Sequence, residues 1–216
     1  MAKPLDPSRL EPRKSPAQAR SAATVGVILE AAARILEERG FEAYTTNEIA
    51  RRAGVGVGSL YQYFPRKEAI TRALIQRETA ILLNEIADLG AEPSGRAGLR
   101  RLIQAAVMHQ LRRPALARLL DFEERRLPLD ADVANVSDTI CSILEDLLGR
   151  PDLPAQSDPA TVARDLLALT KGMVDSAGER GETAMESLER RVGRAVFGYL
   201  QMQLDEIAQA ASFFKK

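Results

Sequence analysis

Apolar residues recur every three or four positions along most of this chain, and that spacing is typical of one buried face of an α-helix. The clearest example lies at residues 24–39, where the apolar stripe comprises Val25, Ile28, Leu29, Ala32, Ile35 and Leu36. The same periodicity, bounded by glycine and proline, predicts further helices at about residues 46–53, 56–64, 67–89, 95–112, 114–126, 131–148, 159–177 and 183–211. No stretch shows the alternation of a β-strand. We therefore predict an all-α protein of about nine helices.

Proline- and glycine-rich segments divide this pattern into three parts. Residues 1–21 contain four prolines, which prevent a continuous helix, so we expect a flexible basic arm there. A first helical domain is predicted at residues 22–68 and a second at residues 69–216. The fourth helix, at about residues 67–89, connects the two, and the turn-rich segment 90–95 follows it.

Two short helices joined by a tight turn, within residues 45–67, contain the most informative motif. Thr46 is the expected N-cap of the first, and Gly54 ends that helix because glycine adopts the left-handed conformation without strain. In the second helix Leu60 and Phe64 are four residues apart and should pack inward with Ile49 and Val55. This geometry predicts a helix-turn-helix, whose second helix enters the DNA major groove.

The outward side of that second helix carries small and polar residues. It comprises Val57, Gly58, Ser59, Gln62 and Tyr63, with Tyr61 at the edge. Each glycine costs a helix about 1 kcal/mol relative to alanine, which is a poor choice for a helix that serves only as core. Small residues instead allow the backbone to approach another surface closely, and the major groove of DNA admits one helix.

The motif resembles the DNA-binding segment of the tetracycline-repressor (TetR/AcrR) family over residues 25–74. The matching residues are Thr46, Ile49, Ala50, Ala53, Gly54, Val55, Gly58, Ser59, Leu60, Tyr61, Tyr63, Phe64, Pro65, Lys67 and Glu68. One departure is Gly56, where family members often have serine. The resemblance implies an N-terminal three-helix DNA-binding domain and a C-terminal helical ligand-binding and dimerisation domain. It also implies a homodimeric repressor of a palindromic operator, released when an effector shifts the fourth helix.

We expect the DNA contacts to come from nine residues. They are Thr46, Gly56, Val57, Gly58, Ser59, Tyr61, Gln62, Tyr63 and Lys67. A tyrosine offers a ring to bases or sugars and a hydroxyl to phosphate, and Lys67 can place a charge on the DNA backbone. Because few side chains on the helix are polar, specificity would depend partly on DNA shape.

Charge is distributed unevenly although the 216-residue chain has zero formal net charge. Up to Thr79 there are thirteen basic and nine acidic residues, so the remainder is acidic by the same difference. This asymmetry suits a DNA-binding part joined to a separate module. The arm has two interpretations: a solubilising tail, or a segment that lies on phosphates or in the adjacent minor groove.

Few residues offer other chemistry. His109 and Cys141 are the only histidine and cysteine, so we predict no disulfide, metal site, cofactor or catalytic residue. A redox role for Cys141 stays open. The glycine-rich run at residues 54–58 lacks the preceding strand that a nucleotide-binding loop requires. Neither a membrane span nor a secretion signal is present, so we expect a cytoplasmic protein.

The last two helices carry a wide apolar arc, which either packs within one subunit or forms a four-helix seam between two subunits. For that seam we expect Leu169, Gly172, Val192, Val196 and Tyr199. For a pocket that binds a hydrophobic or aromatic effector we expect Met108, His109, Phe122, Leu166 and Met173. An alternative function is a helical small-molecule carrier or enzyme whose N-terminal helices are only structural.

Overall fold

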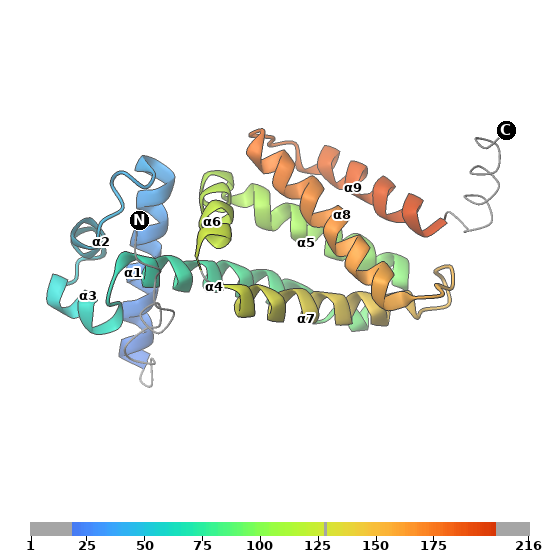
Figure 1. The fold of residues 1–216 in the computed structure, drawn as a ribbon, viewed down its shortest axis with the longest axis horizontal. Coiled ribbons are helices and arrows are strands. Elements are labelled where there is room, and N and C mark those ends of the chain that lie inside the picture. Colours follow the sequence, from blue (N-terminus) through green and yellow to red (C-terminus); the bar gives the residue numbers. More distant parts are fainter. Residues whose placement is uncertain (1–18, 128, 202–216) are drawn as a thin grey trace, which may run out of the picture. The chain divides into compact units, whose positions relative to one another are not determined.

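The computed structural model describes residues 19–127 and 129–201, and every regular element in these ranges is a helix, as the sequence predicts (Figure 1). The α-helices are α1 (Ala19–Arg39), α2 (Thr46–Ala53), α3 (Val57–Tyr63), α4 (Lys67–Ile86), α5 (Gly95–Arg112), α6 (Pro114–Arg126), α7 (Asp130–Leu148), α8 (Pro159–Glu179) and α9 (Met185–Gln201). A short 3₁₀-helix, η2 (Leu89–Ala91), follows α4.

Two helix limits differ from the prediction by more than two residues. Helix α1 begins at Ala19 rather than Thr24, because the alanines that precede Thr24 favour a helix. Helix α4 ends at Ile86, and the 3₁₀ turn takes up the residues that were predicted to extend it. The predicted continuation of α9 beyond Gln201 and all but the last three residues of the predicted arm lie outside the described residues.

The described chain divides into two compact units. The first contains α1, α2, α3, α4 as far as Ile81, and α6. The second contains the end of α4, η2, α5, α8, α9, and α7 from Ala134. The sequence prediction placed everything after residue 68 in the second domain, so the position of α6 in the first unit is a difference from that expectation.

Helix α6 belongs to the first unit because it packs on α1. Leu116 and Leu120 of α6 are buried in the same apolar cluster as Ile28 and Ile35 of α1. Ahead of α6, the Arg113 guanidinium donates two hydrogen bonds to the Glu37 carboxylate, of 2.6 and 2.7 Å. Apolar contact and a bidentate ion pair therefore both join α6 to α1.

The core of the first unit lies under the short helices. Its largest fully buried side chains include Tyr44, Ile49, Leu60 and Phe64, each with no exposed surface. The Tyr44 hydroxyl accepts a hydrogen bond of 3.2 Å from Thr71 on α4, so the buried polar atom has a partner. Burial raises the pKa of the Tyr44 hydroxyl well above its ordinary value.

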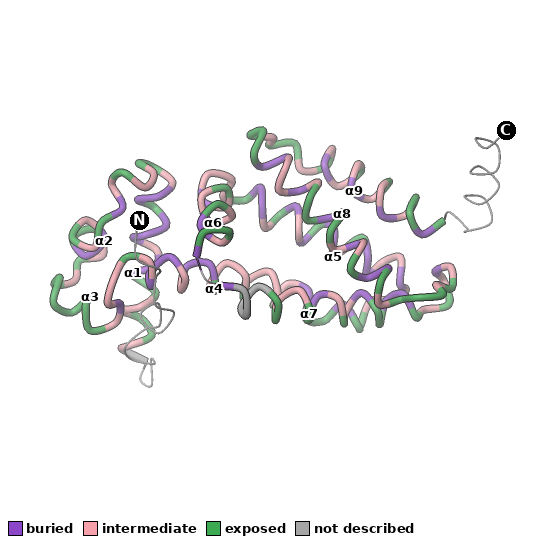
Figure 2. Tube along the Cα trace, in the orientation of Figure 1, coloured by how far each residue is buried: buried purple, intermediate pink, exposed green. Residues whose placement is uncertain are grey.

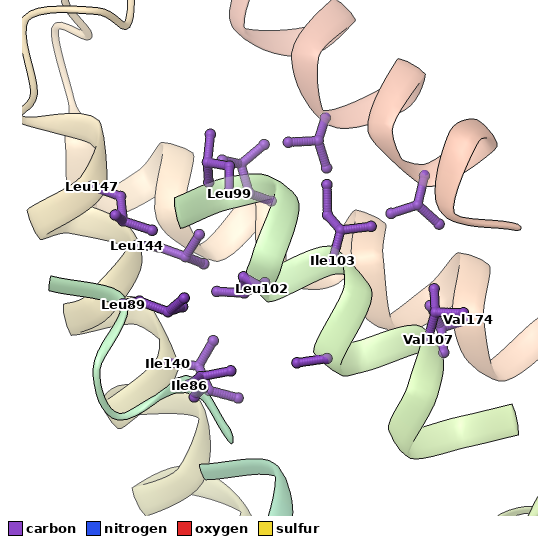
Figure 3. Close-up of a cluster of buried hydrophobic side chains, with 14 of the residues drawn as sticks. Ile86, Leu89, Leu99, Leu102, Ile103, Val107, Ile140, Leu144, Leu147 and Val174 are labelled. Carbon is purple, nitrogen blue, oxygen red and sulfur yellow. The ribbon is translucent and has the colours of Figure 1, made fainter. Parts of the chain in front are cut away.

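The core of the second unit is formed by aliphatic side chains from α4, η2, α5, α7, α8 and α9 (Figure 3). Two glycines at the start of α5 allow α7 and the loop after it to approach closely. A Cβ atom on Gly95 would lie 2.8 Å from the Leu147 carbonyl oxygen, and one on Gly98 would lie 2.4 Å from the Leu147 side chain. The Asp152 carboxylate also accepts hydrogen bonds from the first backbone amides of α5, at Gly95 and Arg96.

Candidate nucleic-acid interface

Helices α2 and α3 form a helix-turn-helix whose turn is determined by glycine. Gly54 has φ 67° and ψ 25°, the left-handed conformation, and its amide is bonded to carbonyl groups of the last turn of α2. Val55 then packs partly buried against the core, and its amide donates to the Ala50 carbonyl. The predicted roles of Gly54 and Val55 are thus confirmed for this turn.

The N-cap of α2 is Thr45, which corrects the prediction of Thr46. Thr45 has an extended backbone, and its hydroxyl accepts a hydrogen bond of 3.2 Å from the Glu48 amide. Thr46 is the first residue of the helix, and its hydroxyl lies 3.0 Å from the Tyr61 hydroxyl. Either of two adjacent threonines can act as a cap. Here Thr45, which follows the buried Tyr44, takes that role, and the helix begins at Thr46.

Helix α3 has one buried side and one exposed side, as expected for a recognition helix. Leu60 is fully buried, and so is Phe64, the C-cap residue that precedes Pro65. Val57 is 39% exposed and Tyr61 is 41% exposed. Both belong to the few large apolar residues that are exposed in the described part of the chain. Figure 2 shows most of α3 as exposed. Gly56, the N-cap, makes no side-chain cap bond, in keeping with the absent serine hydroxyl.

The two tyrosines of α3 differ from the expectation. Tyr61, predicted at the edge, is the exposed one, whereas Tyr63 is half-buried and packs against the core. The Tyr63 hydroxyl lies 3.5 Å from the Ser21 hydroxyl at the start of α1. Ser21 was not predicted, and no sequence signal relates it to Tyr63, since the pair is 42 residues apart.

Most arginines near the motif are already paired with acids. Glu48 accepts from Arg39 and Arg51, with shortest distances of 2.7 Å in both cases, and Glu38 accepts two bonds of 2.6 Å from Arg52. Hydrogen bonds from Arg51, followed by those from Arg39, lower the pKa of Glu48 to about 2. The charge of α2 is therefore largely balanced within the protein.

The junction between α3 and α4 carries the unbalanced positive charge. Lys67, the first residue of α4, is exposed and has no carboxylate partner among the described residues. Arg66, which was not predicted, is half-buried and also has no carboxylate partner among the described residues. Both follow Pro65 at the end of the motif, where they can place charge on a DNA backbone.

The residues predicted to line an effector pocket belong to both units. Leu166 is buried in the core of the second unit, and Met173 packs against that core. Met108 is 39% exposed and His109 is half-buried, both on α5. Phe122 lies on α6 in the first unit and is 55% exposed.

The residues predicted for a subunit interface fall into two groups. Val192 and Val196 on α9 are 0% and 2% exposed and belong to the core of their own unit. Leu169 is partly buried against the same core. Gly172 and Tyr199 face outward, and the Tyr199 hydroxyl donates to the Asp165 carboxylate, which raises the pKa of Tyr199. The outward group and the accessible part of Leu169 are available to a partner.

Metal binding, membrane insertion and cysteine reactivity have little support in residues 19–127 and 129–201. No group of three or more potential metal ligands occurs in these ranges, and none of their helices is long and apolar enough to cross a membrane. Cys141 on α7 is half-buried, and burial raises the pKa of its thiol, which disfavours the reactive thiolate.

A glycine turn, an exposed recognition helix and two cations that lack acidic partners among the described residues define a helix-turn-helix protein of the DNA-binding class. Comparison with known proteins agrees. Residues 28–74 match the model of bacterial regulatory proteins of the tetR family, and residues 96–200 match a model for the tetracyclin repressor-like C-terminal domain. The chain belongs to the TetR family of bacterial transcriptional regulators.

Relatives and solved structures lie in the same class. An HTH-type transcriptional regulator of Mycobacterium tuberculosis is 35% identical over 143 residues, which cover 63% of this chain and 66% of that protein. The transcriptional repressor KstR of Rhodococcus jostii is 31% identical over 142 residues, 63% of this chain and 64% of the relative. The chain thus spans about two thirds of the length of these relatives. The fatty acid degradation regulator FadR from Bacillus halodurans shares the fold, with a TM-score of 0.67 at 19% identity over 83% of this chain and 97% of that one.

The Glu48 cluster predicts a pH-dependent stability of the first unit. Because the folded-state pKa of about 2 lies below the ordinary 4.5, ionised Glu48 stabilises the fold above about pH 4.5. That contribution disappears as the pH falls towards 2. Glu48→Gln should therefore lower the urea midpoint at pH 7, and its difference from the wild type should shrink at pH 4.5 and again at pH 3.

The matched control is Glu42→Gln, which removes an exposed carboxylate with no ion pair among the described residues. Its midpoint should follow that of the wild type at each pH. A Glu48→Gln deficit that stays constant from pH 7 to pH 3 would contradict the assigned role of the carboxylate.

Proposed function

We propose that this protein is a homodimeric transcriptional repressor that binds a palindromic DNA operator and is released by a small hydrophobic or aromatic effector. The observation that carries the proposal is that α3 has one fully buried side and one exposed side. Leu60 and Phe64 hold the helix from behind with no exposed surface, while Val57 and Tyr61 are exposed on a helix too short to be stable alone. A helix held in this way presents its outer face to a groove.

The alternative of a carrier or enzyme with purely structural N-terminal helices is less consistent with this arrangement. Helices that only supply core would bury Val57 and Tyr61, and burying an apolar side chain is worth about 1.5–3 kcal/mol. Both are instead exposed. The relative KstR is described as a transcriptional repressor, which favours negative control, and we infer a cytoplasmic location from that role.

Contacts to the DNA backbone would come from hydroxyl groups and cations. The hydroxyls of Tyr61 and Thr46, 3.0 Å apart and exposed, form a paired donor and acceptor at the first residue of α2, where backbone amides also favour an anion. Lys67 would add a charge beyond the far end of α3, joined by Arg66. Gly56, Val57, Gly58, Ser59, Gln62 and Tyr63 complete the proposed surface.

Dimerisation would use the outward faces of α8 and α9. Gly172 and Gly198 are exposed, and a Cβ atom on either would meet nothing within 4 Å, so the subunit itself does not require these glycines. Each glycine in a helix interior costs about 1 kcal/mol relative to alanine. Close approach of a partner helix accounts for them, with Tyr199 and Leu169 beside the seam. Two recognition helices in such a dimer would address half-sites about 34–36 Å apart.

An effector would bind in the second unit, near the C-terminal half of α5 and the middle of α8. Apolar side chains dominate there, and Gln110 and Thr170 are its buried polar residues among those described. Binding sites for small molecules combine such apolar linings with a few polar groups that orient the ligand. We propose Met108, His109, Leu166 and Met173 as residues of this site. Phe122 belongs to the first unit and is left out of it.

Lys67→Gln should weaken operator binding and reduce its dependence on salt. Each lost phosphate contact lowers the slope of log affinity against log salt by about 0.9, so a dimer should lose about 1.8. Operators selected from a random DNA pool and titrated by fluorescence anisotropy from low to high salt provide the measurement. Lys171→Gln, which changes an exposed residue of α8, is the control and should keep the wild-type slope. An unchanged slope for Lys67→Gln would remove this residue from the interface, and no enriched DNA at all would refute the proposed function.

Gly172→Leu should dissociate the dimer without unfolding the subunit. Leucine replaces a glycine whose surroundings within the subunit are empty, so helicity and thermal stability should be retained, while the added side chain blocks a partner helix. Analytical ultracentrifugation should show monomers at concentrations where the wild type is dimeric. Gly26→Leu changes an equally open, exposed helical glycine on α1 and should remain dimeric. A dimer of wild-type affinity for Gly172→Leu would place the seam elsewhere.

A panel of hydrophobic and aromatic small molecules should include compounds that raise the thermal midpoint, because a ligand that binds only the folded state stabilises it by RT ln(1 + [L]/Kd). For such compounds Met173→Ala should show a smaller shift than the wild type. Met185→Ala, which truncates another methionine packed on the same core, should respond as the wild type does. Equal responses of the two variants would argue against the proposed site.

A further inference from the structure

The chemical inventory of α3 limits which bases it can recognise. The helix consists of Val57, Gly58, Ser59, Leu60, Tyr61, Gln62 and Tyr63. Guanine is recognised most often by arginine or lysine at its O6 and N7 atoms, and cytosine by aspartate or glutamate. None of these four residue types occurs in α3. The arginines of α2 that lie nearest in sequence are paired with Glu48 and Glu38.

Val57 is the exposed apolar group at the start of the helix. It is 39% exposed and is the first helical residue, and the N-terminal residues of a recognition helix contact base edges. Gly56 and Gly58 flank it, and a Cβ atom on Gly58 would meet nothing within 4 Å. The two flanking glycines carry no side chain that would separate Val57 from the floor of a groove. The apolar feature that the major groove offers is the C5-methyl group of thymine.

Gln62 is the side chain of α3 best suited to a purine. It is exposed and lies one turn beyond Gly58 on the same side of the helix, so the missing side chain at Gly58 leaves its amide accessible. A glutamine amide has one donor and one acceptor side, which match N6 and N7 of adenine. Tyr61 is less available for bases, because its hydroxyl is already bonded to Thr46.

We propose that α3 recognises A·T base pairs, with Val57 against a thymine methyl group and Gln62 on an adenine, and makes no side-chain contact specific for guanine. The inference rests on the proposed function, since it assigns the base preference of that same interface. Operator half-sites should then be A·T-rich at the positions under α3. The Ser59 hydroxyl would add a hydrogen bond that can form with either kind of base pair.

The test uses operators selected from a random DNA pool, with single atoms of the conserved bases then changed. Replacing thymine by deoxyuridine removes only the methyl group, which is worth about 0.8 kcal/mol when buried, or about fourfold in affinity per half-site. The wild type should lose this affinity when thymine is replaced at one position of each half-site. Val57→Ala should bind the thymine and deoxyuridine operators with equal affinity. Replacing adenine by 7-deazaadenine, which lacks N7, should weaken the wild type at another position and leave Gln62→Ala unaffected.

Gln104→Ala, an exposed change on α5 in the second unit, is the control and should keep both sensitivities of the wild type. Conserved G·C pairs at the positions under α3, or a wild type that binds deoxyuridine and thymine equally at every position, would overturn the inference while DNA binding itself stands. A pool from which no sequence is enriched would instead contradict the proposed function.

Discussion

The burial of Leu60 and Phe64 is the constraint on which the rest of the first unit depends. Helix α3 has only seven residues, and a helix of that length is unstable in water without tertiary contacts. Two fully buried side chains four residues apart hold it, and they thereby determine which side faces outward. The exposed glycines, Val57, Tyr61 and Gln62 follow from that orientation. The proposed base recognition is a consequence of how the core is packed.

Charge in the first unit is organised so that the DNA-facing cations are few. Exposed ion pairs contribute little stability individually, and the pairs of Glu48 with Arg39 and Arg51 are of this kind. Their larger effect is to neutralise α2, although the N-terminal part of the chain carries an excess of positive charge. Arg66 and Lys67, without acidic partners among the described residues, are then the groups from which salt-dependent attraction can arise.

Helix α6 extends the first unit beyond the contiguous N-terminal sequence. The chain leaves this unit within α4, returns at Arg113 and leaves again in α7. Arg113 follows directly on the last residue of α5, and its bidentate bond to Glu37 attaches the return point to α1. Hydrogen bonding to Glu37 accordingly raises the pKa of Arg113.

Local chemistry along the chain was sufficient to predict the helices, the turn and the buried side of α3. Gly54 ends α2, Pro65 follows α3, and Pro114 and Pro159 begin α6 and α8, because the effects of glycine and proline on the backbone act within a few residues. Periodicity identified Leu60 and Phe64 in the same way. Tertiary packing alone decided the cap between two adjacent threonines, the exposure of Tyr61 rather than Tyr63, and the unit to which α6 belongs. It also placed Val192 inside the subunit and left Gly172 outside, since a periodic pattern shows that a face is apolar but does not show which neighbour covers it.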